Sequence, residues 1–130
     1  MENLPKTIKN YLIDIDGTIC DDIPNEYPEK MVTAQELPGS NAKEILNGLY
    51  DAGHIVTFFT SRTEQAHGDI TRTWLREHGF KHHGVLFGKP RGGNYHWVDN
   101  LEVRATQFKG KFTPFVTKSK DILVFDDEGK

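Results

Sequence analysis

The chain has 130 residues, of which 36% are hydrophobic and 27% are charged, and its formal net charge is -3. These values are typical of one globular domain, and we expect residues 1–130 to form a single one. The negative charge gives no general attraction to nucleic acid or to an anionic membrane. The one cysteine excludes an internal disulfide. Because no stretch has the length of a membrane span or the apolar character of a secretion signal, we expect a cytoplasmic protein.

The first expected strand, at about residues 9–15, ends in a pair of acids, Asp14 and Asp16, followed by Gly17 and Thr18. Alternation along a strand places the two carboxylates on the same side, about 6 to 7 Å apart. Two ionised carboxylates so close are stable only if one takes up a proton or a cation lies between them. Mg²⁺ suits such a place because it prefers carboxylate, water and phosphate oxygens. A plain acidic turn is the structural alternative.

The next segment, residues 20–41, is acidic and is interrupted by three prolines, which prevents a long helix. We expect an irregular, flap-like excursion over the end of the first strand, with Met31 and Val32 in a short strand. Cys20 begins this segment. Its neighbours Asp21 and Asp22 oppose thiolate formation, so a nucleophilic role for Cys20 is disfavoured.

Strands and helices then alternate along the chain. Ser40 or Asn41 can cap the first helix, and the expected elements are a helix at about 42–52, a strand at 54–59, a helix at 65–78 and strands at 85–87 and 95–98. This alternation predicts an α/β fold, a three-layer sandwich with a mainly parallel, Rossmann-like sheet and helices on both faces. Residues 112–116 and 122–125 are candidates for added edge strands, and residues 126–130 for a solvated tail.

Polar groups follow the ends of the later strands as well. Thr60 and Ser61 follow the second strand, Lys89 the third and Asp99 the fourth. In a parallel sheet the carboxyl ends of the strands meet at one edge, which is where ligands bind. The structural alternatives are a helix cap for Thr60 and Ser61 and a solvated loop for Lys89.

The order of these groups resembles the four motifs of the haloacid dehalogenase (HAD) superfamily of phosphotransferases. The resemblance covers about residues 11–108, with Asp14-Ile15-Asp16-Gly17-Thr18 as the first motif, followed by Thr60, Lys89 and Asp99. More narrowly, the chain resembles the small bacterial and phage members that lack a separate cap domain. About forty residues lie between the first two motifs and a single expected helix between the next two, which leaves no room for a cap.

The resemblance implies a Mg²⁺-dependent phosphomonoester hydrolase. Asp14 would attack phosphorus and form an aspartyl-phosphate, and Asp16 would protonate the leaving oxygen and then activate water. Mg²⁺ would be held by the Asp14 side chain, the Asp16 backbone carbonyl and Asp99. The phosphoryl oxygens would contact Thr60 and Ser61, while Lys89 would offset the charge of both Asp14 and the phosphate.

Two departures from the family pattern bear on the metal site. Asn100 follows Asp99 where members commonly offer a second acid, and only nine residues separate Lys89 from Asp99. Asp126 and Asp127, after the apolar residues 122–125, are a competing choice for the last motif; the short spacing of the small subfamily favours Asp99. Arg62 stays open, as a partner of either substrate or an acid.

The resemblance also bears on partners. Capless members act on large substrates or form oligomers, so the substrate is expected to be a small phosphorylated molecule or the phosphorylated end of a larger one, and a homo-oligomer is an expected arrangement. Two alternatives remain. One is a catalytically weak or inactive phosphate-binding or regulatory module, and the other is a nucleic-acid end phosphatase, which the acidic balance does not favour.

Overall fold

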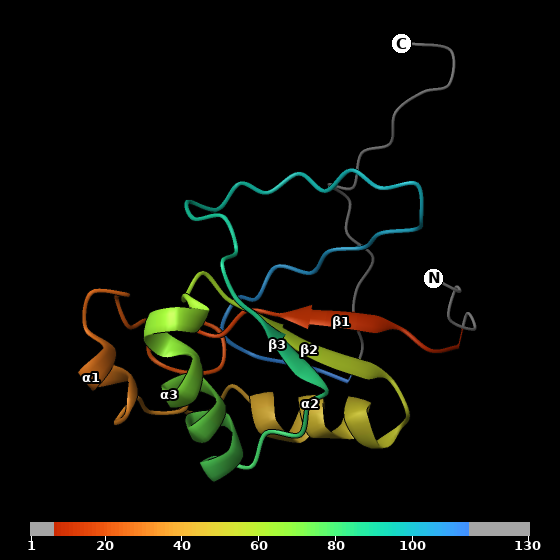
Figure 1. Cartoon of the computed structure of the whole chain (residues 1–130). Coiled ribbons are helices and arrows are strands. Elements are labelled where there is room, and N and C mark those ends of the chain that lie inside the picture. Colours follow the sequence, from red (N-terminus) through yellow and green to blue (C-terminus); the bar gives the residue numbers. More distant parts are fainter. Residues whose placement is uncertain (1–6, 115–130) are drawn as a thin grey trace.

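The computed structural model describes residues 7–114, which form an α/β fold around a three-stranded parallel sheet (Figure 1). The elements in chain order are β1 (Asn10–Ile13), α1 (Pro28–Met31), α2 (Ala42–Asp51), β2 (Ile55–Phe59), α3 (Glu64–Glu77) and β3 (Gly84–Leu86). The α/β class and the lack of a cap domain are confirmed. The expectation that residues 1–130 form a single domain stays a prediction.

Alternate residues of the strands form the core face of the sheet. Val56 and Phe58 of β2 are fully buried, whereas Ile55, Thr57 and Phe59 between them are only partly buried. In register with Phe58 lie Ile13 of β1 and Val85 of β3. This period-two pattern is what β-branched and aromatic residues produce when one face of a sheet packs more tightly than the other.

Both longer helices pack against this same face. Ala42 and Leu46 of α2 belong to one hydrophobic cluster with Trp74 and Leu75 of α3 and with the buried residues of β2. The strand order β1-β2-β3 explains this, because parallel crossovers are nearly always right-handed and successive ones in the same direction put their helices on one side. The helical layer expected on the second face is not seen among residues 7–114.

The helix boundaries follow from local capping. Thr63 is the N-cap of α3, and its hydroxyl accepts a hydrogen bond from the backbone N–H of Ala66 at 3.2 Å. At α2 the Ser40 hydroxyl accepts from the N–H of Ala42 at 3.3 Å, while Asn41 adopts φ 59° and uses no side-chain cap. Of the two capping residues considered, Ser40 therefore makes the bond.

The excursion at residues 20–41 differs from its prediction in one respect. Met31 ends the helix α1 and is fully buried, and Val32 follows it as an exposed C-cap, so the expected short strand is wrong. Pro28 explains the helix, because its fixed φ suits the first helical turn. The excursion is held to the rest of the fold by the Trp74 indole N–H, which donates to the carbonyl of Ala34 at 3.0 Å.

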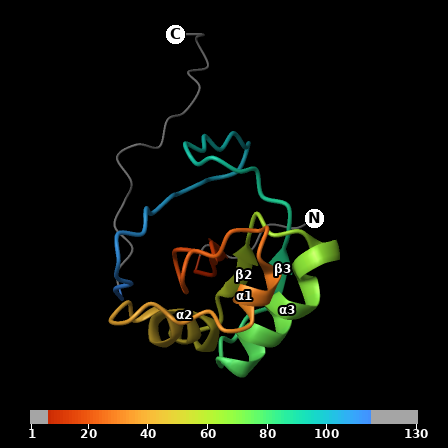
Figure 2. The same cartoon turned by 90° about the vertical axis from the view of Figure 1, so that its left-hand side faces the viewer.

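Residues 91–107, which we call the arm, form neither helix nor strand. The strand expected at 95–98 is therefore wrong for this chain on its own: these residues have the composition of a strand, but a strand also needs a neighbouring backbone to pair with. Figures 1 and 2 show the arm on the side of the sheet opposite α2.

Beyond the arm, residues 112–114 are not in a strand, although Phe112 packs against the core. The other segments for which strands or a tail were expected, 115–116, 122–125 and 126–130, lie outside the described residues. Within residues 7–114, none of the helices combines the length and the apolar character needed to span a membrane.

Candidate active site at the strand ends

Asp14 lies directly after β1 and is held by two side chains. Its Oδ1 accepts from the Lys89 ammonium at 2.8 Å, and its Oδ2 accepts from the Thr18 hydroxyl at 2.9 Å. The Asp14 side chain is 38% exposed and that of Lys89 is 15% exposed. Lys89 comes from the loop after β3, so residues 75 positions apart meet where the carboxyl ends of the strands converge. Asp14 is thus charge-balanced and still open to solvent.

Asp16 is held in a different way, by Arg62. The Arg62 Nη2 donates to Asp16 Oδ1 at 2.7 Å and its Nε donates to Oδ2 at 2.9 Å, which is the bidentate geometry of a strong guanidinium–carboxylate pair. The third guanidinium nitrogen donates to the Thr71 hydroxyl of α3 at 2.9 Å. The Arg62 side chain is 2% exposed and that of Asp16 is 12% exposed. Asp16 is thus much less accessible than Asp14.

These contacts show how the chain accommodates two neighbouring acids. We expected a proton or a cation between Asp14 and Asp16; instead each carboxylate has its own side-chain cation, Lys89 for one and Arg62 for the other. Gly17, with φ 80°, turns the chain immediately after the pair. Arg62, which sequence reasoning left open, is therefore the partner of an acid.

The two cation-bearing loops are tied together through their backbones. The N–H of Lys89 donates to the carbonyl of Thr60, and the N–H of Gly88 donates to that of Arg62, both at 2.9 Å. The Thr60 hydroxyl accepts from the N–H of Arg62 at 3.1 Å, and Thr60 is 1% exposed. Ser61 is partly buried, and its carbonyl accepts from the Asn25 side chain at 3.0 Å. Thr60 thus has a structural role whatever its role toward phosphate.

Asn25 also contacts a buried histidine that the sequence analysis did not identify as a site residue. His67 of α3 accepts from the N–H of Thr63 through Nδ1 at 3.0 Å, which leaves Nε2 as the donor to the carbonyl of Asn25 at 2.9 Å. These bonds fasten the excursion to the start of α3. The sequence signal that could have identified His67 is a polar residue on the buried side of an amphipathic helix, because buried polar groups need hydrogen-bond partners.

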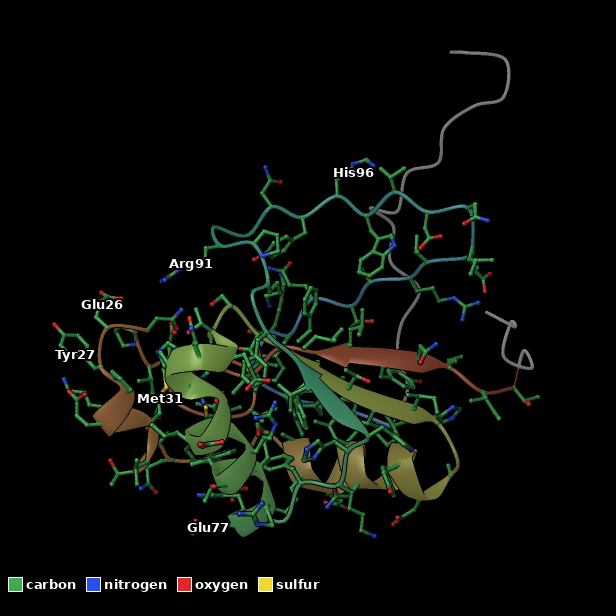
Figure 3. All side chains as sticks on the ribbon, in the orientation of Figure 1. Glu26, Tyr27, Met31, Glu77, Arg91 and His96 are labelled. Atoms are coloured by element: carbon green, nitrogen blue, oxygen red, sulfur yellow. The ribbon has the colours of Figure 1, made fainter. Side chains whose placement is uncertain are left out.

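The remaining predicted site residue, Asp99, lies on the arm. Its Oδ1 accepts from the N–H of Leu101 at 3.0 Å and its Oδ2 accepts from the Trp97 indole N–H at 3.1 Å, and these two bonds lower its pKa. Figure 3 shows His96, three positions earlier, on the outer part of the arm, far from α1 and α3. The structure places Asp14, Asp16, Thr60, Ser61 and Lys89 on connected turns at the strand ends. Within residues 7–114, Asp99 forms no metal-binding group with Asp14 and Asp16.

Asp14 fits a magnesium ion as a first ligand. Mg²⁺ is commonly held by one or two carboxylates, with water and substrate phosphate in the other positions, and each Asp14 oxygen keeps a second lone pair. The part of the chain that the structure describes nevertheless contains no group of three His, Cys, Asp or Glu side chains arranged to bind a metal. Among residues 7–114, Asp14 is therefore a candidate single carboxylate ligand and not part of a three-ligand group.

Cys20 lies beside this site without being part of its chemistry. The side chain is fully buried, and burial, with a further contribution from Asp16, raises the pKa of the thiol to about 12. A thiol with this pKa is protonated at neutral pH and is a poor nucleophile.

Comparison with solved structures supports the fold. A crystal structure of a structural-genomics target from Vibrio cholerae matches with a TM-score of 0.52 and 21% identity, covering 75% of this chain and 84% of that one. A chain of the Pnkp1/Rnl/Hen1 complex matches with a TM-score of 0.54 and 17% identity, covering 76% of this chain and 33% of that one. At such identities the likeness shows the fold alone. No family model and no curated protein sequence matches the chain.

Proposed function

We propose that this protein is a Mg²⁺-dependent hydrolase of phosphomonoesters in which Asp14 is the nucleophile. The observation that supports this most is the contact between Asp14 and Lys89. An accessible carboxylate lies at the carboxyl end of a parallel sheet with an ammonium 2.8 Å from one of its oxygens. An anionic nucleophile must approach an anionic phosphate, and a cation shared by both lowers their repulsion.

The proposed reaction has two displacements. An Asp14 oxygen forms a bond to phosphorus as the ester oxygen leaves with a proton, and water then attacks the aspartyl-phosphate to release inorganic phosphate. Asp16 is the proposed donor and acceptor of the proton. Because both of its oxygens accept from Arg62, one of them has to be released from the guanidinium before it can carry that proton.

The neighbouring loop supplies the proposed phosphate contacts. Thr60 and Ser61 follow β2, and Thr60 still has its hydroxyl proton to donate, since its oxygen acts as an acceptor toward Arg62. The exposure of Asp14 matches a phosphate on a small molecule or at the end of a larger one. Mg²⁺, held by the Asp14 side chain, the Asp16 carbonyl and Asp99, would neutralise charge on the phosphoryl oxygens.

A second candidate function is phosphate binding without turnover, in a regulatory module. The pairing of Asp16 with Arg62 favours it, because a carboxylate held on both oxygens is not free to transfer a proton. The two functions predict different behaviour: the binding module retains phosphate analogues such as beryllium fluoride with Mg²⁺ but hydrolyses nothing across a broad panel of phosphomonoesters.

The test is hydrolysis of an aryl phosphate with added Mg²⁺ by the unmodified chain and by Asp14→Asn. We expect phosphate release that disappears in the variant and also with a chelator, and that returns when Mg²⁺ is restored. Asp51→Asn is the matched control, since Asp51 pairs with the exposed Lys81 at 2.8 Å, away from the site. Full activity of folded Asp14→Asn would refute the assignment, and no activity of the unmodified chain on any substrate would favour the binding module.

A further inference from the structure

One edge of the sheet is open in the described residues. β1 is the terminal strand in the order β1-β2-β3 and pairs with β2 alone among residues 7–114. Leu12 in its middle is 40% exposed. The edge of a sheet presents backbone N–H and C=O groups to any strand that can align with them, and natural proteins usually cover or disrupt such an edge. This one lies directly beside Asp14.

The arm carries a dense group of exposed apolar side chains. Four of its large apolar side chains are more than half exposed, and they fall within seven consecutive residues: Tyr95, Trp97, Val98 and Leu101. Isolated exposed apolar residues are ordinary, but a group this dense on one short segment is typical of an interaction surface. The segment 95–98 also has the same length as β1, which is four residues.

We propose that residues 95–98 of a second copy of this chain pair in parallel with the open edge of β1 and thereby place the second copy's Asp99 beside Asp14. This inference rests on the proposed function, for which it supplies the missing carboxylate. The position of Asp99 follows from the direction of the strands, because Asp14 comes directly after β1 and Asp99 comes directly after residue 98. When parallel strands are aligned, their carboxyl ends meet. The exchange is reciprocal, so two copies form two equivalent sites.

The register that this pairing requires agrees with the side chains. Val98 of the second copy lies next to Ile13, which packs on the core, and its Trp97 lies next to the exposed Leu12. At these two positions apolar residues meet apolar residues, with one pair on each face of the added strand. Neighbouring parallel strands bring such side chains into contact, which covers surface that each chain alone leaves in water.

The chain's own arm cannot readily take this place. Only residues 87–94, eight positions, connect the end of β3 to residue 95, and the connection would have to pass β2 and β1 before returning to the start of β1. A parallel crossover takes a dozen or more residues. An antiparallel arrangement needs fewer, but it would put Asp99 at the opposite end of β1 from Asp14. A second copy avoids both problems.

A turn of residues with positive φ lies where the arm must change direction. Gly92, Gly93 and Asn94 are consecutive, and all three have positive φ, at 109°, 74° and 55°. Such residues let the backbone turn in either direction at low cost. Across this turn Tyr95 still contacts Lys89, whose ammonium lies 5.5 Å from the Tyr95 ring. Figure 3 shows Arg91 at the base of the arm and His96 beyond the turn.

The first test uses mixed dimers. Asp14→Asn and Asp99→Asn are each expected to be inactive alone. When the two chains are co-expressed or refolded together, half of the dimers are mixed and each mixed dimer has one intact site, so activity should return to about a quarter of the unmodified level. Asp14→Asn mixed with Lys89→Met is the matched control, because both residues belong to the same chain's part of the site and no intact site can form. Absence of restoration in the first mixture would overturn the inference.

The second test does not depend on activity. Leu12→Cys and Trp97→Cys are combined in one chain and treated with a short bis-maleimide; Cys20 is fully buried and stays in place. We expect a crosslinked dimer on a denaturing gel, and none from either single variant or from Leu86→Cys with Trp97→Cys, since Leu86 lies on the opposite edge strand. A crosslink within one chain, or a monomer at every concentration in sedimentation, would show that the arm stays with its own chain. Crosslinked dimers in a protein that hydrolyses nothing would refute the proposed function and keep this pairing.

Discussion

Arg62 holds both carboxylate oxygens of Asp16, a residue 46 positions earlier in the chain, at 2.7 and 2.9 Å. The pair is almost fully shielded from water, and Thr71 accepts from the remaining guanidinium nitrogen. This contact joins the turn after β1 to the turn after β2 and to α3. It is therefore both part of the candidate active site and a main connection of the fold.

Replacing Arg62 with Met should lower the free energy of unfolding by about 3 to 5 kcal/mol, because Asp16 is then left as a shielded charge with no partner. The measurement is urea denaturation followed by circular dichroism. Lys81→Met is the control: it removes an exposed ion pair with Asp51 and should cost less than about 1 kcal/mol. If Arg62→Met costs no more than Lys81→Met, the Arg62–Asp16 pair does not stabilise the fold.

Lys89→Met should separate activity from stability. The ammonium contacts Asp14, which is 38% exposed and can be solvated by water instead. The free energy of unfolding should therefore change by less than about 1 kcal/mol. Loss of the charge opposite the phosphate should lower kcat/KM by about 10²- to 10³-fold. Steady-state kinetics on an aryl phosphate, with Lys81→Met as the matched variant, measure this. Unchanged kcat/KM would mean that Lys89 does not act on the phosphoryl group.

Thr60 can be tested as an acceptor for the backbone. Thr60→Val keeps the shape but leaves the N–H of Arg62 without its acceptor, which should cost about 1 to 3 kcal/mol of stability. Thr60→Ser keeps the hydroxyl and should lie close to the unmodified chain. Urea unfolding compares the three proteins. Equal stability of the Val and Ser variants would contradict the structural role, and weaker binding of inorganic phosphate by folded Thr60→Val than by Thr60→Ser would support the proposed second role.

Cys20 predicts a pH dependence at the alkaline end. Burial raises the pKa of the folded thiol from 9.0 to about 12. Between these pH values the unfolded chain loses the proton and the folded chain keeps it, so this group lowers stability as pH rises above about 9, by up to about 1.4 kcal/mol per pH unit. The difference in thermal midpoint between the unmodified chain and Cys20→Ala, followed from pH 8 to 11, isolates this contribution. A constant difference would contradict it.

Much of the fold could be predicted from local patterns. The run from Ile55 to Phe59 is β-branched and aromatic, and the two longer helices have apolar residues at helical spacing, so strands and helices appear where expected. The closeness of Asp14 and Lys89 also followed from sequence, because strand ends converge in a parallel sheet.

Two of the failures, at Arg62 and at residues 95–98, come from long-range contacts, and the failure at Met31 comes from a local helix start. The partnership of Arg62 and Asp16 depends on how a long side chain reaches across two turns, which no spacing encodes. Met31 is helical because Pro28 starts a short turn of helix that buries it. Residues 95–98 have strand composition, but within residues 7–114 no strand pairs with them, and a strand exists only as part of a pair.

The backbone bonds from Gly88 to Arg62 and from Lys89 to Thr60 have a consequence for any reaction at Asp14. They fix the backbones of the two loops relative to each other, so the Lys89 ammonium beside Asp14 is already in position when an anion arrives. Water around a free lysine and arginine would have to rearrange as charge moves, and that reorganisation energy adds to a barrier. In the proposed reaction, the fixed position of Lys89 would make this reorganisation energy smaller.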